Sequence, residues 1–437
     1  MAKKKISSRR SVSAGRIRAQ EARHLMNTYK RPPIIFTRGR GCRLYDANGR
    51  EYLDFLGGIA VNALGHAHPR LVRVIRRESA RAIHLSNLFH NAYQGPLAAK
   101  LANWSGLDRV FFTNSGTEAI EGALKLARAY AYGKRKSSAI TANAKKTRIL
   151  ALENSFHGRT FGALSITYPK KYREPFEPLV PGVDFVRVND IADLDTKFTD
   201  EVCAIVIEPL QGEGGIYPVS DAFWKRSREL ATQYGAVLIA DEIQCGLGRT
   251  GREFAYQGLT GLPDIVVVAK PLAGGLPLGA FMAVEEVASA FSPGLHGSTF
   301  GGGPLTCATA LTFLEAVERK KLLANVRTRG AELRAGLKNL AKKFDFIREV
   351  RGEGLMIGVD LDVEGAPYVA EALKQGLLIN CTHDHILRLL PPFILTAQQV
   401  KEGLTKLESV FAKTERPPNS ATVPSSNAAD LTLAAAR

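Results

Sequence analysis

The feature that most constrains the fold is an alternation between about residues 95 and 300 of short apolar runs and stretches of helical periodicity. The runs are apolar throughout, as in strands buried on both faces of a parallel sheet. Repeated strand–helix units predict an α/β fold, with helices on both faces of a mostly parallel sheet. The predicted strands are residues 110–112, 148–152, 202–207, 236–240 and 265–269, and the predicted helices are 117–132, 222–234 and 306–318.

After about residue 325 the pattern becomes that of a smaller α+β domain, with predicted helices at 326–344 and 366–375 and predicted strands at 347–351, 355–360, 377–380 and 386–390. A hairpin predicted at residues 43–52, turning at Asn48-Gly49, is expected to pack with this domain. Polar stretches predict a surface loop at 133–147. The expected division is a basic flexible N-terminal tail (1–24), an N-terminal segment (25–90), a large domain (91–324), a small domain (325–413) and a disordered tail (414–437).

Positive charge is concentrated at the N-terminus, since residues 1–50 hold 14 Lys and Arg residues and only 2 acidic ones, within a total net charge of +17. A solvated tail explains this positive charge better than an organellar transit peptide or a nucleic-acid-binding arm.

No stretch of the sequence predicts a membrane span. Five widely spaced cysteines predict neither a disulfide framework nor a zinc site and fit a cytoplasmic location. We expect no metal, nucleic-acid or membrane partner.

Polar residues follow each predicted strand of the large sheet at its carboxyl end, where open α/β sheets bind ligands. A small turn at residues 113–118 leads directly into a helix and suits an anion, although an ordinary N-cap would have the same sequence. A carboxylate that ends a buried strand, such as Glu208 or Asp241, is costly unless it is paired or functional. Lys270 ends the last strand, where a lysine extending to solvent is the ordinary alternative.

Taken together, these residue types match the needs of pyridoxal phosphate. A helix N-terminus and hydroxyls suit its phosphate, and an aspartate suits its pyridine nitrogen. Partial burial of Lys270 would disfavour its charge and make its amine nucleophilic toward an aldehyde. Gln244 offers a donor to the ring oxygen, and Phe156 offers an aromatic face on which the ring can stack.

In their order along residues 25–411, the motifs resemble the class III pyridoxal-phosphate-dependent aminotransferases. The matching stretches are Ser-Gly-Thr-Glu-Ala at 115–119, Phe-His-Gly-Arg-Thr at 156–160, Glu-Pro at 208–209, Gln-Gly-Glu-Gly-Gly at 211–215, Asp-Glu-Ile-Gln at 241–244, Gly-Arg-Thr-Gly at 248–251, Lys270 and Gly-Ser-Thr-Phe-Gly-Gly at 297–302. Within the family, the stretches at 27–31, 53–62 and 86–89 are most similar to the acetylornithine aminotransferases.

This resemblance implies the type I aminotransferase fold, with a large domain around a mostly parallel sheet and a smaller α+β domain. It implies transfer of the terminal amino group of N2-acetyl-L-ornithine to 2-oxoglutarate in arginine biosynthesis. The products would be N-acetyl-L-glutamate 5-semialdehyde and L-glutamate. It also implies a homodimer with shared active sites.

The resemblance further implies a role for each cofactor residue. Lys270 would bind the cofactor aldehyde and move a proton, Asp241 would pair with the pyridine nitrogen, and Gln244 would bond the ring oxygen. Phe156 would stack on the ring. The phosphate would be held by Ser115, Gly116 and Thr117, and by Thr299 from the other subunit.

For the substrates, the resemblance implies two arginines. Arg159, assisted by Ser298, would bind the substrate α-carboxylate through a bidentate contact. Arg388 would bind a second carboxylate, and Glu208 would cover this arginine until 2-oxoglutarate enters.

Two positions depart from the family pattern: Pro271 directly follows the lysine, and Gly303 stands where asparagine is usual.

Three alternative functions stay open. Another ω-aminotransferase would act on ornithine, succinylornithine, a carrier-linked lysine or 4-aminobutyrate. An aminomutase would use the same scaffold without a keto acid, and a basic nucleic-acid-binding protein would depend on the N-terminal charge.

Overall fold

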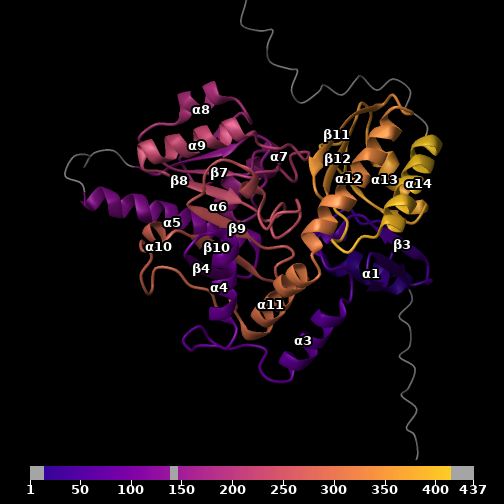
Figure 1. The fold of residues 1–437 in the computed structure, drawn as a ribbon, viewed down its shortest axis with the longest axis horizontal. Coiled ribbons are helices and arrows are strands. Elements are labelled where there is room, and N and C mark those ends of the chain that lie inside the picture. The colour runs from indigo at the N-terminus through magenta and orange to yellow at the C-terminus, as the bar shows by residue number, and fades with distance from the viewer. Residues whose placement is uncertain (1–13, 138–145, 415–437) are drawn as a thin grey trace, which may run out of the picture.

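The computed structural model describes residues 14–137 and 146–414, and its centre is a seven-stranded sheet (Figure 1). Strand β10 runs antiparallel to both of its neighbours, and the other pairings in this sheet are parallel. The predicted α/β fold with a mostly parallel sheet is therefore confirmed. In spatial order the strands are β4 (Arg109–Thr113), β10 (Gly279–Ala283), β9 (Ile265–Val268), β8 (Val237–Asp241), β7 (Val202–Ile207), β5 (Arg148–Leu152) and β6 (Val183–Val186).

Both faces of this sheet are buried, which explains why its strands are apolar throughout. Successive side chains of β8 join two different core clusters: Val237 and Ile239 pack in one, Leu238 and Ala240 in the other. The first cluster includes the apolar stripe of α5 (Gly116–Ser137). Helices that contribute side chains to the second include α4 (Gln94–Ser105), α8 (Ile191–Lys197), α9 (Asp221–Tyr234) and α11 (Pro304–Arg319).

Two smaller, four-stranded sheets accompany the large sheet. One contains β11 (Ile347–Glu353), β12 (Met356–Leu361), β15 (Ile386–Leu389) and β14 (Asn380–Thr382). The other joins the N-terminal strands β1 (Phe36–Arg40), β2 (Arg43–Asp46) and β3 (Glu51–Asp54) to the short parallel strand β13 (Leu377–Leu378). The helices of the C-terminal part are α12 (Leu322–Ala341), α13 (Ala366–Lys374) and α14 (Ala397–Lys413).

The remaining elements are short or lie near the N-terminus. They are α1 (Ala14–His24), α2 (Gly57–Ala60), α3 (Pro69–Ser79), α6 (Phe161–Ser165), α7 (Lys170–Arg173), α10 (Glu285–Ala288) and the 3₁₀ turns η1 (Glu174–Phe176) and η2 (Ala255–Gly258). Among the described residues, no helix is both long and apolar enough to cross a membrane. In the same part of the chain, no group of three His, Cys, Asp or Glu side chains has the arrangement of a metal site.

Several local predictions differ from the structure. Residues 14–24 form helix α1 although they were expected in a flexible tail; none of its side chains is buried. Helix α5 continues to Ser137, past the predicted end at residue 132, so Gly133 lies within the helix and does not end it. Strands β1, β6 and β10 were not predicted. The expected tail segments 1–13 and 415–437 and the loop core 138–145 lie outside the described residues, and the predicted domain boundaries stay predictions.

Candidate active site

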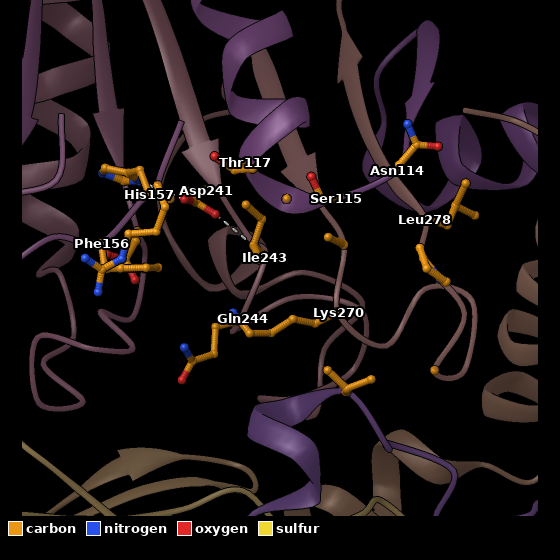
Figure 2. Close-up of a pocket in the computed structure, with 18 of the residues that line it drawn as sticks. Asn114, Ser115, Thr117, Phe156, His157, Asp241, Ile243, Gln244, Lys270 and Leu278 are labelled. Atoms are coloured by element: carbon orange, nitrogen blue, oxygen red, sulfur yellow. Dashed lines mark hydrogen bonds and ion pairs between the residues drawn. The ribbon is translucent and has the colours of Figure 1, made fainter. Parts of the chain in front are cut away.

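Loops at the carboxyl ends of β4, β5, β7, β8 and β9 surround a cavity of about 430 Å³ (Figure 2). This is the edge of the sheet at which the sequence predicts a ligand site. Nine of the twelve predicted site residues line the cavity: Ser115, Gly116, Thr117, Phe156, Arg159, Glu208, Asp241, Gln244 and Lys270.

The turn after β4 forms one wall of the cavity and ends at the N-terminus of α5. Backbone N–H groups in the first turn of a helix have no partner within the helix, and the helix dipole adds positive potential there. A Cβ atom on Gly116 would lie 2.8 Å from the Ile243 side chain, so only glycine lets this turn approach that loop. Hydroxyls of Ser115 and Thr117 border the same space. This geometry suits a small anion, and the Ser115 hydroxyl also accepts the Glu118 backbone N–H at 3.3 Å, as an ordinary N-cap does.

Lys270 follows β9 and is half-buried at the cavity wall (Figure 2). Its backbone has a φ of 28°, in a region that non-glycine residues rarely adopt and that occurs mostly at functional sites. Burial lowers the pKa of its amine, although the nearby carboxylates of Glu213 and Asp241 oppose that shift. A lowered pKa increases the fraction of neutral, nucleophilic amine.

Asp241 is the last residue of β8 and also lines the cavity. One carboxylate oxygen is 2.7 Å from Nδ1 of His157, and the other accepts a hydrogen bond from the Ile243 backbone N–H at 3.0 Å. His157 was not among the predicted site residues, although it lies next to Phe156 in the same motif. Nε2 of His157 is buried and has no hydrogen-bond partner among the described residues.

Glu208 does not contact Arg388, so the expectation that it covers this arginine is wrong. Its two carboxylate oxygens accept backbone N–H groups of Phe156 and Gly212, each at 2.9 Å. Burial raises the pKa of Glu208 to about 7, against the opposing effect of nearby His157. Glu208 therefore holds together the two loops that follow β5 and β7.

Arg388, on β15, pairs instead with Glu213, five residues further along the loop from Glu208. Its Nη1 atom lies 2.5 Å from Oε1 of Glu213 and also donates to Oε1 of Gln244 at 3.1 Å. The arginine side chain is 1% exposed, whereas that of Glu213 is 34% exposed. Burial alone would raise the pKa of Glu213, but the charge and hydrogen bond of Arg388 outweigh it, so the pKa is lowered.

Arg159 lies at the exposed rim of the cavity, above two aromatic rings. Its guanidinium carbon is 3.8 Å from the centroid of Tyr172 and 5.4 Å from that of Phe156. Sequence reasoning missed Tyr172, because nothing in the local pattern distinguishes it from other surface tyrosines.

Ser298 and Thr299 do not line the Lys270 cavity of their own chain, although the Ser298 hydroxyl accepts a hydrogen bond at 3.3 Å from Asn114, which does. They line a separate hollow of about 790 Å³, together with residues such as Asn87 and His296. The Asn87 side-chain amide donates to the Ser298 carbonyl at 2.9 Å, whereas Thr299 is exposed. Within one chain, the structure therefore does not bring these two residues to the proposed phosphate or carboxylate positions.

The chain matches a known protein family and is similar to characterised proteins. Residues 25–411 match the family described as aminotransferase class III. The chain is 44% identical to an acetylornithine aminotransferase of Aquifex aeolicus, covering 89% of this chain and 100% of that protein. It is 43% identical to one of Methanocaldococcus jannaschii, covering 91% and 98%.

Solved structures with this fold include two aminotransferases. An ornithine aminotransferase of Toxoplasma gondii, described with partial occupancy of PLP at its active site, is 32% identical, with a TM-score of 0.87 and coverage of 92% of this chain and 95% of that one. An acetylornithine aminotransferase of Elizabethkingia anophelis is 30% identical, with a TM-score of 0.80 and coverage of 92% and 100%.

Proposed function

The chain belongs to the class III aminotransferases, which use pyridoxal phosphate, and on that premise we propose that it transfers the terminal amino group of N2-acetyl-L-ornithine to 2-oxoglutarate. One observation carries the proposal: a lysine amine with a lowered pKa, a buried aspartate and an anion-binding turn border the same cavity. We assign the reaction to arginine biosynthesis, as the substrate implies.

The cavity suits the cofactor on its own chemistry. The turn at Ser115, Gly116 and Thr117 would hold the phosphate, and the missing Cβ of Gly116 lets this turn pack against Ile243. Asp241 would hold the pyridine nitrogen, and Phe156 would cover one face of the ring. When bound, the cofactor supplies an aldehyde and an electron-accepting ring.

The protein's own groups perform the remaining tasks. Lys270 Nζ, whose pKa is lowered by burial, would provide the covalent attachment and then carry the proton that must move between two carbons. His157 holds the Asp241 carboxylate in one orientation through its 2.7 Å hydrogen bond. Glu208 fixes Phe156 through the backbone and thereby sets the position of its ring.

Two arginines explain how one pocket accepts two different substrates. Arg159 at the rim binds the carboxylate that both substrates carry at their far end. Arg388 is neutralised by Glu213 while the acylated amine reacts, because that donor has no second carboxylate. When 2-oxoglutarate enters, its second carboxylate replaces Glu213 on Arg388. Glu213 thus takes the covering role that the resemblance gave to Glu208.

The choice of amine donor is supported by similarity to known enzymes. Similarity to the enzymes named acetylornithine aminotransferase reaches 43–44% identity over about nine-tenths of the chain, whereas similarity to the ornithine enzyme of Toxoplasma gondii is 32%. The test is a donor profile of the purified enzyme at saturating 2-oxoglutarate. We expect N2-acetyl-L-ornithine to have the highest kcat/KM among acetylornithine, ornithine, succinylornithine and 4-aminobutyrate. Faster turnover of free ornithine would contradict the proposal.

We also propose a homodimer in which each chain completes the other's site. Large apolar side chains are exposed along and beside the hollow that holds Thr299: Ile83 is 65% exposed, Leu88 87%, Phe89 72% and Phe300 64%. Several large apolar side chains exposed near one hollow are typical of a protein interface. Thr299 would then reach the partner's phosphate site, and Ser298 would assist the partner's Arg159.

Light scattering of the purified protein tests the dimer. We expect twice the chain mass, together with weaker cofactor binding in Thr299→Ala and unchanged binding in the matched surface variant Ser292→Ala. A monomer that retains full activity would refute the shared site.

A cytoplasmic location remains part of the proposal, supported by five free cysteines, one of them half-buried and the others buried.

A further inference from the structure

The contacts of Arg159 are unusual for a residue expected to bind an anion. Within the described residues, no hydrogen bond or ion pair holds its guanidinium, which instead lies over two aromatic rings. The nearer ring, Tyr172 at 3.8 Å, belongs to the short helix α7 and is half-buried. Tyr172 in turn meets Phe156 edge-on, with ring centroids 6.4 Å apart and an interplanar angle of 86°.

Stacking leaves the guanidinium well suited to a carboxylate. A guanidinium that lies flat on a ring keeps its N–H groups in its own plane, where they form bidentate bonds with a planar anion. The ring therefore restricts the orientation of the arginine without occupying its donors. An exposed arginine without such a contact loses rotamer freedom when it binds a carboxylate, and this entropy loss weakens carboxylate binding.

We propose that Tyr172 is the positioning residue for substrate carboxylates: its ring holds the Arg159 guanidinium flat, with its donor edge free for the anion. This inference rests on the proposed role of Arg159. Both substrates of the reaction carry a carboxylate at that end, so Tyr172 affects both. Through its edge contact with Phe156, the same ring keeps the arginine at a constant distance from the residue proposed to stack on the cofactor.

A second cation near the ring must be separated from this effect. Nζ of Lys171 lies 5.4 Å from the Tyr172 centroid, and Lys171 is exposed. General attraction of anions by this lysine would weaken with salt and would not require an aromatic ring. Lys171→Met is therefore a control that removes a neighbouring charge and leaves the stacked pair in place.

The experiment compares Tyr172→Leu and Tyr172→Phe with two amine donors. N2-Acetyl-L-ornithine carries the carboxylate, and N-acetylputrescine is the same molecule with hydrogen in its place. We expect Tyr172→Leu to raise the KM of acetylornithine by about tenfold, the upper end of the effect of immobilising one long side chain on binding, with little change in kcat. In Tyr172→Leu, the kcat/KM for N-acetylputrescine should be unchanged. Tyr172→Phe should have the wild-type KM for acetylornithine, because it keeps the ring.

Binding of glutarate, a dicarboxylate that cannot react, provides a readout independent of turnover. Calorimetric titration should give a dissociation constant raised about tenfold in Tyr172→Leu and unchanged in Lys171→Met. If Tyr172→Leu does not fold, judged from its thermal unfolding, Tyr172→Gln replaces it.

Different failures have different meanings. An unchanged KM for acetylornithine in Tyr172→Leu, or an equal loss with both donors, overturns the role of Tyr172. If Arg159→Met itself leaves this KM unchanged, the proposed function of Arg159 fails instead. The double variant Arg159→Met/Tyr172→Leu should be no weaker than Arg159→Met alone, and full additivity would also overturn the inference.

Discussion

Replacing Glu213 by glutamine should change which substrates the enzyme accepts. The variant keeps the size of the side chain but removes the negative charge that faces Arg388, whose side chain is 1% exposed. In the wild type, an incoming second carboxylate must displace this partner. In Glu213→Gln it meets an arginine that is already free, so binding of dicarboxylates becomes stronger.

The magnitude follows from the burial of the pair. Exposed ion pairs contribute about 1 kcal/mol or less, and breaking a buried pair costs about 3–5 kcal/mol. With one partner buried and the other 34% exposed, the pair lies between these limits, at about 2 kcal/mol. This free energy corresponds to about 30-fold in binding. We therefore expect the ratio of kcat/KM for L-glutamate to that for N2-acetyl-L-ornithine to rise by about 30-fold.

Single-turnover half-reactions measure this ratio directly, because each amine is mixed with enzyme in the absence of a keto acid and followed by the absorbance of the cofactor. Glu208→Gln is the matched control. Since Glu208 contacts only backbone N–H groups of Phe156 and Gly212 here, it should slow both donors alike and leave their ratio within about threefold. An unchanged ratio in Glu213→Gln, or a large change in Glu208→Gln, would refute the assignment.

Three further predictions concern the lysine, the rim arginine and a buried carboxyl. Lys270→Ala should lose the visible absorbance of the lysine-bound cofactor, and its turnover should fall by at least about 10³-fold, because the variant lacks both the covalent attachment and the proton carrier. An unchanged absorbance band in the reconstituted protein would exclude Lys270 as the attachment site. Arg159→Ala should raise the KM of acetylornithine about 10- to 100-fold, measured by steady-state rates, because a charge-assisted contact is lost. For Glu242, burial raises the pKa to about 7, so the unfolded chain releases this proton from about pH 4.5 and the folded chain only near pH 7. Stability should fall as pH rises between these values, by up to about 3 kcal/mol, and urea titrations of Glu242→Gln should show that part of the pH dependence removed; parallel curves for the two proteins would contradict it.

Strand order in the chain was enough to predict most of the cavity. Five apolar runs, each followed by chemically distinctive residues, placed Ser115, Phe156, Asp241 and Lys270 at one edge of a sheet, and all four line the cavity. This succeeds because parallel strands end at the same edge, so the position of a residue relative to its own strand determines where it lies. The antiparallel strand β10 was missed, since its short run Gly279–Ala283 has little β-branched character.

The sequence by itself determined the fold class, the family and the residues that surround the cofactor site, because those properties depend on local patterns repeated along the chain. Only the tertiary structure decided which carboxylate faces Arg388. Glu208 and Glu213 lie five residues apart and are the same residue type, but one is turned toward backbone N–H groups and the other toward β15. Likewise, His157 contacts Asp241 at the end of β8, and Arg159 contacts Tyr172 on α7. Such contacts depend on how loops fold over the sheet edge, and side-chain packing across that edge leaves no periodic signal in the chain.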